Sequence, residues 1–467
     1  MGSPFIRNCY RTIMVLLAAT LTFLPQPASA EVTSVVINSS SPLGEFDGKS
    51  YIAVKGTMYG TVDGTIRVYN VPLMYEFPED PSDCNGFAVA EPLHQGAGPA
   101  SLAVIGPDYM FGNGYVHAAV GWDNSADANQ SKGNTEQLGD AHQVLQDLSS
   151  LLRNPSPFLE GPCPVDNIIA FGTSRTGSFW RGFLFSGKNH PLLYDGFLIN
   201  AAGALRLDLS GGNGTRRHVS YPGPLPEDGS KKIATNNEHD VDLYQGWKVR
   251  TETPSYRVYE SAGTPHLAIR ILNLAGPPWF ATRQSPAHHG PVVKAMLRHL
   301  HDWISHGTEP PPSVTLPGTG DVDVPLNDRV SMIACTPCTQ ISCPNPTDIL
   351  PRCKIYQFIR DDFGNATGGV RLPFMEVPIG TYTGVERTFP NPNAPNAVRE
   401  LISQGGTFTP FSQDMLNELY PKHGTYVKKI AEAARMARDN DWILGEDVGA
   451  YTSEGADLSV GHSFEGP

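Results

Sequence analysis

The sequence predicts an α/β fold, with a mostly parallel central sheet and helices on both of its faces. Between about residues 85 and 270, short apolar runs of strand length alternate with longer stretches of helical period, which is the pattern of such a sheet. Residues 32–80 are instead rich in β-branched residues and short turns, which predicts an antiparallel edge of strands before the parallel part.

The first thirty residues have the pattern of a secretory signal peptide. Arg7 and Arg11 precede an apolar run over residues 12–24, and small residues follow at Ala28–Ala30. A basic start, a short apolar run and a small-residue cleavage site favour export, with cleavage after Ala30. The alternative is an uncleaved anchor, although the run is short for a membrane span. We therefore expect a periplasmic or secreted protein.

The mature chain would contain 437 residues (467 − 30), enough for one large domain. We expect N-terminal strands over 31–85, a catalytic core over 86–310 and a cysteine-rich segment over 330–375, followed by a helical C-terminal region over 405–467. Removal of the two signal arginines takes the formal net charge from −13 to −15. An acidic surface argues against nucleic acid and anionic membranes as partners and leaves a small-molecule substrate as the expected partner. The sequence does not determine the oligomeric state.

Six cysteines remain after the expected cleavage, an even number that predicts disulfides in an oxidising compartment. Cys84 and Cys163 are candidates for one bridge. The other four lie close together in one segment, so a zinc ion bound by four thiolates is the alternative there. The export signal and the irregular spacing favour disulfides over zinc. These four are Cys335, Cys338, Cys343 and Cys353.

The elements of the core can be predicted in chain order. A helix is expected over 135–152, an irregular excursion or part of a lid over 202–230, a helix over 287–307, and a last helical region over about 412–440. The pair His288-His289 is interpreted as ordinary loop sequence and not as a metal site. The predicted core strands are residues 86–90, 115–120, 167–171, 194–199, 232–235 and 256–259.

The most informative segment is Gly172-Thr-Ser-Arg-Thr-Gly177, which joins the apolar strand at 167–171 to an expected helix over 178–185. This order is typical of a nucleophile elbow, in which a serine occupies a strained turn between strand and helix. The second glycine arrives one residue late, with Thr176 in its usual place. A Gly-x-Ser before a helix can also be only a helix cap, so the interpretation of Ser174 depends on partners elsewhere.

Such partners follow the next two predicted strands. A serine hydroxyl needs a base, and the base needs a carboxylate to orient it. The strand at 232–235 leads to Glu238 and Asp240, and the strand at 256–259 leads to His266. The order Ser, acid, His is that of α/β-hydrolases. We predict His266 as the base and prefer Asp240 as the acid, with Glu238 as the alternative.

Further along the chain, spaced segments resemble the large family of bacterial α/β-hydrolase-domain proteins. The resemblance covers nearly the whole mature chain, and it implies the α/β-hydrolase fold with catalytic roles for Ser174 and His266. The family's elbow more often has Gln-Ser after the nucleophile, where this chain has Arg175-Thr176. The segments that carry the resemblance are 172–177, 194–197, 259–266, 300–313, 364–365, 368–373, 410–412 and 419–421.

Together these observations predict an exported serine hydrolase, with carboxylic esters as the expected substrates. The backbone N–H of Arg175 is expected to be one oxyanion donor, with a second from the loop within Pro92–Gly96. Neither a metal nor an organic cofactor is expected. The alternatives are an amidase or peptidase with the same three residues, and a binding protein that keeps the hydrolase scaffold without its activity.

Overall fold

The computed structural model describes ten stretches of the chain: residues 31–62, 68–94, 98–122, 141–159, 161–207, 218–220, 224–267, 285–325, 352–385 and 404–461. The signal segment, Cys335, Cys338, Cys343 and parts of the expected 202–230 excursion lie outside these residues, as do Gln95 and Gly96 of the predicted oxyanion loop. Cys353 is described only in its backbone.

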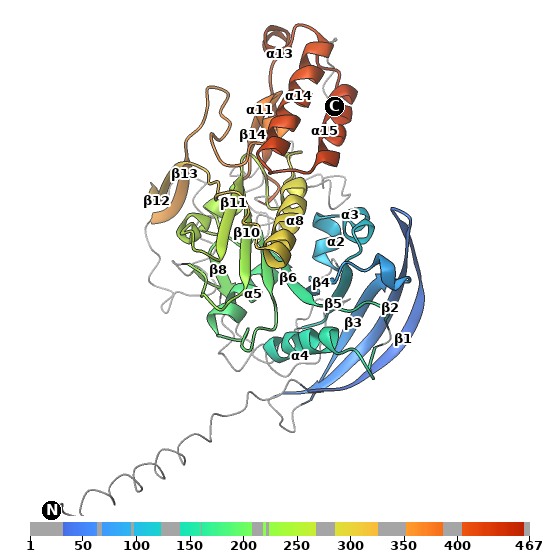
Figure 1. Cartoon of the computed structure of the whole chain (residues 1–467). Helices are drawn as coiled ribbons and strands as arrows, with labels where there is room; N and C mark the ends of the chain where they lie inside the picture. The colour runs from blue at the N-terminus through green and yellow to red at the C-terminus, as the bar shows by residue number, and fades with distance from the viewer. Residues whose placement is uncertain are drawn as a thin grey trace, which may run out of the picture.

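A nine-stranded sheet forms the centre of the molecule (Figure 1). Its spatial order is β1-β2-β3-β5-β4-β6-β7-β10-β11; β1, β2, β3 and β5 pair antiparallel, and every pair from β5 to β11 is parallel. The predicted antiparallel edge and parallel core are therefore confirmed. The strands are β1 (Glu31–Phe46), β2 (Lys49–Thr61), β3 (Val68–Pro78), β4 (Phe87–Pro92), β5 (Val116–Val120), β6 (Asn167–Thr173), β7 (Gly196–Asn200), β10 (Lys231–Asn237) and β11 (Tyr256–Ser261).

Alternation along the buried strands builds a separate core on each face of the sheet. In β6, Ile169 and Phe171 belong to one hydrophobic cluster, whereas Ile168 and Ala170 belong to the other. Successive side chains of a strand point to opposite faces, and a strand that is apolar throughout needs cover on both. The first cluster is covered by α2 (Ala100–Val104), α3 (Pro107–Gly112) and α8 (Gly290–His306), and the second by α4 (Ala141–Arg153) and α5 (Arg175–Phe185).

The C-terminal part packs against the first cluster, at one end of the molecule in Figure 1. The helical region expected over about 412–440 is two helices, separated at Pro421, and a third helix follows within the C-terminal region that we expected to be helical (405–467). The elements here are α11 (Pro373–Glu376), β14 (Gly380–Thr383), β15 (Thr407–Pro410), α13 (Gln413–Leu419), α14 (His423–Asp439) and α15 (Gly445–Asp457). Smaller elements elsewhere are η1 (Pro81–Asp83), α6 (Glu238–Asp242), η3 (Gly246–Val249) and the strand pairs β8 (Leu205–Leu207) with β9 (His218–Ser220) and β12 (Gly318–Pro325) with β13 (Arg352–Phe358).

The predicted boundaries of two core helices need correction. The helix after the elbow begins at Arg175 and not at Ser178, because the turn that carries Ser174 passes directly into it. The helix expected from residue 287 begins at Gly290, where Pro291 occupies the first turn. Proline favours that position since its missing N–H would have no partner within the helix.

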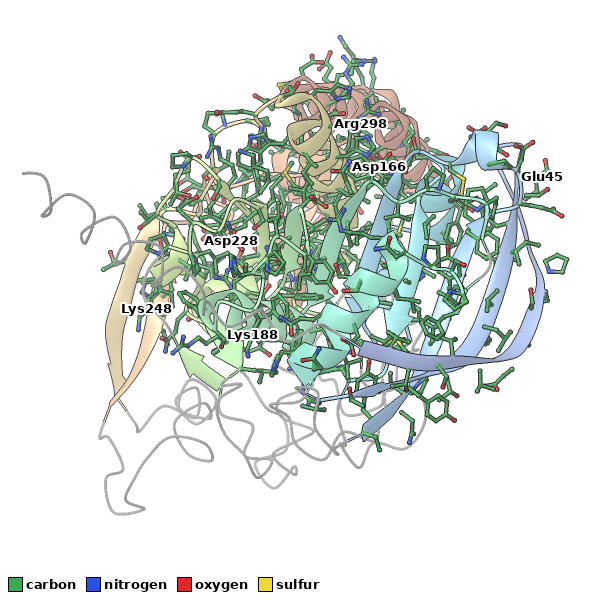
Figure 2. All side chains as sticks on the ribbon, turned by 60° about the horizontal axis from the view of Figure 1, so that its bottom comes forward. Glu45, Asp166, Lys188, Asp228, Lys248 and Arg298 are labelled. Atoms are coloured by element: carbon green, nitrogen blue, oxygen red, sulfur yellow. A yellow bond between two sulfur atoms is a disulfide. The ribbon has the colours of Figure 1, made fainter. Side chains whose placement is uncertain are left out.

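Cys84 and Cys163 form a disulfide, with an S–S distance of 1.98 Å. This confirms the expected pair, and it joins the segment before β4 to the segment before β6. Charged side chains such as Glu45 and Arg298 lie at the surface (Figure 2). Within the described stretches, no helix combines the length and apolar character needed to cross a membrane.

Candidate active site

Ser174 occupies a strained turn between β6 and α5. Its backbone has φ 53° and ψ −115°, a conformation that non-glycine residues rarely adopt and that costs about 1–3 kcal/mol. The backbone N–H of Ser174 donates to the carbonyl of Asn200 at the end of β7 (2.9 Å). The turn therefore holds the serine side chain at the carboxyl edge of the sheet, at the first residue before the helix.

The neighbours of Ser174 explain the unusual spacing of the elbow glycines. A Cβ at Gly172 would lie 2.6 Å from the Trp180 ring and 2.7 Å from the backbone of Thr176. The Thr176 hydroxyl closes the turn, since it donates to the Thr173 carbonyl and accepts from the Thr173 N–H, both at 2.9 Å. Gly177 provides the second close approach, where a Cβ would lie 3.1 Å from the Asn200 carbonyl. Gly177, which comes one residue later than in the usual motif, thus allows α5 to approach β7.

Two other chain segments bring a base and an acid to this serine. His266 Nε2 lies 2.9 Å from Ser174 Oγ, and His266 Nδ1 lies 2.6 Å from Asp240 Oδ1. His266 comes from the loop after β11, and Asp240 from α6, directly after β10. Because β6, β10 and β11 are parallel, their carboxyl ends meet at one edge of the sheet. The structure therefore brings together the three residues that the sequence predicted, with Asp240 as the acid next to His266.

Glu238, the alternative acid, has a different set of partners. Its side chain accepts from the N–H of Gly263 (2.7 Å) and from the guanidinium of Arg360 (2.7 Å). Gly263 has φ 67° and lies in the turn that leads from β11 to His266. Glu238 thus holds the histidine loop in place from the opposite side of α6, and it does not contact the imidazole.

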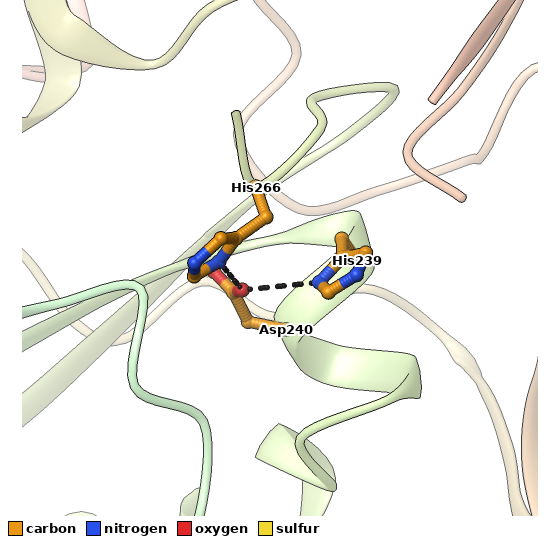
Figure 3. A group of neighbouring side chains, drawn as sticks. All are labelled: His239, Asp240 and His266. Atoms are coloured by element: carbon orange, nitrogen blue, oxygen red, sulfur yellow. Dashed lines mark hydrogen bonds and ion pairs between the residues drawn. The ribbon is translucent and has the colours of Figure 1, made fainter. Parts of the chain in front are cut away.

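The environment of Asp240 stabilises its ionised form. Burial alone would raise the pKa of Asp240, but the charge of His266 and hydrogen bonds from His239 and His266 outweigh burial and hold that pKa well below its ordinary value. The second carboxylate oxygen accepts from the N–H of Asn237 (2.8 Å). Figure 3 shows the carboxylate of Asp240 between the rings of His239 and His266. A carboxylate fixed in this way can orient the imidazole and stabilise its protonated form.

His239, Asp240 and His266 are also the one group of described residues whose donor atoms lie close enough together, within 4.8 Å, to hold a metal ion. A metal there would take up the Asp240 carboxylate and the Nδ1 of His266. Both atoms already belong to the hydrogen-bonded chain that ends at Ser174. The donor set is therefore better matched to a proton relay than to a metal.

Two of the three residues, Ser174 and His266, open onto a cavity of about 330 Å³. Ser174 and His266 form part of its wall, so a bound molecule can reach the serine hydroxyl. Its wall includes apolar side chains as well as histidine and amide side chains. The remaining lining residues are His94, Ala100, Ala103, Val104, Thr173, Asn200, Asn237, Pro265, Leu267, His289 and Gln404.

Comparison with known families agrees with this geometry. The profile of a family described as "Alpha/beta hydrolase domain" matches residues 46–453. The chain belongs to this α/β-hydrolase domain family. The match includes every strand from β2 to β11 and all three residues of the hydrogen-bonded chain. None of the curated proteins compared with the sequence matches it.

Solved structures similar to this α/β-hydrolase are distant from it. The rice cell wall degrading esterase LipA from Xanthomonas oryzae is 10% identical, with a TM-score of 0.26, over 38% of this chain and 51% of that chain. A putative dienelactone hydrolase from Klebsiella pneumoniae is 11% identical, with a TM-score of 0.34, over 55% of this chain and 99% of the other. Acetyl xylan esterase 1 from a Thermoanaerobacterium species is 14% identical, with a TM-score of 0.24, over 36% and 52%. The chain thus spans about half the length of the two esterases, and likeness at this level carries no information about substrate.

Next to the site lies a buried group of charged residues that the sequence analysis missed. His117 on β5 is fully buried, and its two ring nitrogens contact Glu76 on β3 (2.6 Å) and Glu91 on β4 (2.9 Å). Glu91 also accepts from the N–H groups of Ala100 (2.8 Å) and Ser101 (3.2 Å) at the start of α2. Because Ala100 lines the cavity, these residues fix the wall nearest the loop where the second oxyanion donor was expected. The sequence signal that could have indicated this group was a polar residue in each of three strands that are consecutive in the sheet.

The elbow has a second connection to the same loop. The guanidinium of Arg175 lies over the ring of Trp122, 5.0 Å from its centroid, and the Trp122 indole N–H donates to the carbonyl of Leu93 (2.9 Å). The Arg175 side chain is therefore directed to the aromatic ring. Of the described part of the predicted oxyanion loop, His94 lines the cavity and pairs with Gly98.

His288-His289 lies in irregular backbone before α8, as expected, but His289 has a place in the cavity wall that we did not predict. This residue is buried, with 6% of its surface exposed, and it lines the cavity at the residue directly before α8. This position was hard to predict, because residues 281–290 have no clear hydrophobic period. The only signal was a histidine close to a predicted helix start.

Proposed function

We propose that this protein is a serine hydrolase that cleaves carboxylic esters through an acyl-enzyme at Ser174. The observation that carries the proposal is the continuous chain of hydrogen bonds from Ser174 through His266 to Asp240, at the edge of a cavity. A serine hydroxyl is a weak nucleophile at neutral pH unless a neighbouring base removes its proton. Membership of the α/β-hydrolase domain family supports hydrolysis as the class of reaction.

In the proposed first step, Ser174 Oγ attacks the ester carbonyl carbon while His266 Nε2 takes its proton. Asp240 keeps the imidazole in the tautomer with its proton on Nδ1 and stabilises the imidazolium that forms. His266 then gives the proton to the departing alkoxide, which leaves as an alcohol. Water, deprotonated by His266, attacks the acyl-enzyme in the second step and releases the carboxylic acid, and Ser174 recovers its proton.

The negative charge that develops on the carbonyl oxygen requires N–H donors in fixed positions. We assign one to the backbone N–H of Arg175, the first residue of α5, where the helix directs its N–H groups outward and presents the positive end of its dipole. The loop that follows β4 is the proposed source of the second donor. Loss of one such donor costs about a hundredfold or more in rate.

Export to an oxidising compartment is also part of the proposal. The basic and apolar start of the sequence supports it, and so does the Cys84–Cys163 disulfide, since disulfides persist mainly outside the reducing cytoplasm. Cleavage after Ala30 would leave a mature protein that starts at Glu31, the first residue of β1.

The decisive experiment compares wild type with Ser174→Ala on p-nitrophenyl acetate and on labelling by a fluorophosphonate probe. We expect the variant to lose at least about 10⁴-fold in kcat and to lose all labelling. Ser178→Ala is the matched control, because Ser178 lies one turn along α5 and its hydroxyl donates to the backbone carbonyl of Ser174 (3.1 Å) and not to the Ser174 side chain. Undiminished turnover by Ser174→Ala would refute the mechanism. Parallel assays on anilides of the same acids would show an amidase if the anilides were preferred.

A further inference from the structure

His289 is one of the polar side chains that line the cavity and take no part in the proposed mechanism. His289 lies at the N-terminal end of α8, and it shares the cavity wall with Ser174 and His266. It is almost completely buried, so its ring is fixed by the surrounding protein. A buried polar group that faces a cavity is a natural candidate for contact with a bound molecule.

The two ring nitrogens of His289 have different surroundings. Nδ1 is sealed from solvent and has no hydrogen-bond partner among the described residues. Because His289 lines the cavity and its Nδ1 is sealed, we infer that the ring faces the cavity with its opposite edge, which carries Nε2. Buried N–H groups without a partner are rarer in proteins than acceptors without one. This favours the tautomer with the proton on Nε2, which directs an N–H donor into the cavity.

The charge state of His289 agrees with this arrangement. Burial, with smaller contributions from His288 and His266, lowers the pKa of His289 to about 4, although the charge of Asp240 acts in the opposite direction. The ring is therefore neutral at ordinary pH and has one donor and one acceptor. A neutral donor selects an uncharged oxygen, such as a hydroxyl, ether or carbonyl, and gives a carboxylate no charge–charge attraction.

We propose that the cavity selects esters that carry a second, uncharged oxygen in the acyl or alcohol part, and that His289 Nε2 donates a hydrogen bond to that oxygen. The inference rests on the proposed esterase function and adds a substrate class to it. Apolar lining residues such as Ala103, Val104 and Leu267 would contact the carbon chain. Small side chains there and a volume of about 330 Å³ fit a short substrate.

A site built around a buried donor rejects an analogue that leaves the donor without a partner. One neutral hydrogen bond contributes about 0.5–1.5 kcal/mol, which corresponds to a preference of about two- to tenfold. The measured quantity is the ratio of kcat/KM for an oxygenated ester to that for its isostere. Comparison of this ratio between wild type and variant cancels the difference in intrinsic reactivity of the two esters.

Three isosteric pairs test the proposal. The p-nitrophenyl esters of methoxyacetate and butyrate, and those of 3-hydroxybutyrate and 3-methylbutyrate, probe the acyl side. The pair 2-methoxyethyl acetate and butyl acetate probes the alcohol side. In His289→Leu we expect the ratio for at least one pair to fall two- to tenfold from its wild-type value. His289→Gln, whose amide N–H lies near the position of Nε2, should restore most of it.

Val104→Ala is the control on an apolar lining residue, since it should change KM for both members of a pair alike. If His289→Leu does not fold, His289→Phe keeps a flat ring without the donor. Ratios that are equal in wild type and in the Leu or Phe variant for all three pairs would overturn the proposal. Such a result leaves the esterase function intact, because that function stands or falls with the loss of turnover and labelling in Ser174→Ala.

Discussion

Two groups of carboxyl and histidine side chains lie near the same cavity and differ in one respect. In the first, His266 has a single carboxylate partner, Asp240, and its other nitrogen contacts the hydroxyl of Ser174. In the second, His117 has a carboxyl group on each nitrogen, Glu76 and Glu91. A histidine whose second nitrogen contacts a hydroxyl at the cavity can exchange a proton during the reaction, whereas a histidine with a carboxyl group on each nitrogen cannot.

The difference is electrostatic as well as geometric. Burial lowers the pKa of His117, but hydrogen bonds and charges from Glu76 and Glu91 outweigh it and raise that pKa to about 9. His117 is therefore a cation at neutral pH and a fixed part of the sheet. The comparison shows that a buried carboxyl–histidine contact does not identify a catalytic base. The role of such a histidine depends on what its second ring nitrogen contacts and on whether that partner is accessible from the cavity.

The largest effect that this comparison predicts is in catalysis. Asp240→Asn should lower kcat by about 10⁴-fold, because the amide no longer holds the required tautomer of His266 or stabilises the imidazolium. Glu238→Gln, two residues away in α6, should have a much smaller effect on kcat and act mainly on stability through the contacts to Gly263 and Arg360. Steady-state kinetics on p-nitrophenyl acetate measures both. Equal losses in the two variants would mean that Asp240 has no special role.

The next effect is in stability. His117→Phe leaves Glu76 and Glu91 buried without their cation, and removal of one member of a buried charged group costs about 3–5 kcal/mol. We expect the variant to unfold at a clearly lower urea concentration than wild type. The folded fraction should still react with a fluorophosphonate at Ser174, since His117 does not contact the serine. Loss of labelling in folded variant protein would place His117 in the catalytic group instead.

The three residues of the proposed catalytic group were predictable because each follows a recognisable strand. Ser174, Asp240 and His266 come directly after buried runs that the sequence marks clearly, and parallel strands bring their carboxyl ends together. The choice between Glu238 and Asp240 was harder, since both follow β10 within four residues. Both carboxylates contact the histidine loop, Asp240 at His266 and Glu238 at Gly263, and the partner that distinguishes Glu238 is Arg360, more than a hundred residues away in the sequence.

The buried charged group and His289 were not predictable in the same way. Glu76, Glu91 and His117 belong to β3, β4 and β5, and their contact depends on β5 lying between the other two strands. Chain order does not determine that arrangement. The role of His289 depends on the position of α8 against α2, where a Cβ at Gly290 would lie 2.9 Å from the Val104 carbonyl. Tertiary contacts of this kind leave no periodic pattern in the sequence.

The smallest effect is a dependence of stability on pH. The pKa of His117 is about 9 in the folded protein and about 6.5 when unfolded. A histidine whose pKa is raised by folding contributes its full stabilisation below the unfolded value and loses it as pH rises through the folded value. Between pH 7 and 9 the loss should amount to about 2 kcal/mol, measured as the difference between the urea-unfolding curves of wild type and His117→Phe.

Glu76→Gln sharpens this measurement, because it removes one of the two charges that raise the pKa of His117 and leaves the histidine in place. The pKa of His117 should fall toward its ordinary value, so this variant should lose the stabilisation at a lower pH than wild type. His266, whose partners are unchanged, should give the same pH profile of ester hydrolysis in both proteins. If Glu76→Gln moved the activity profile and left the stability profile in place, the roles assigned to the two histidines would have to be exchanged.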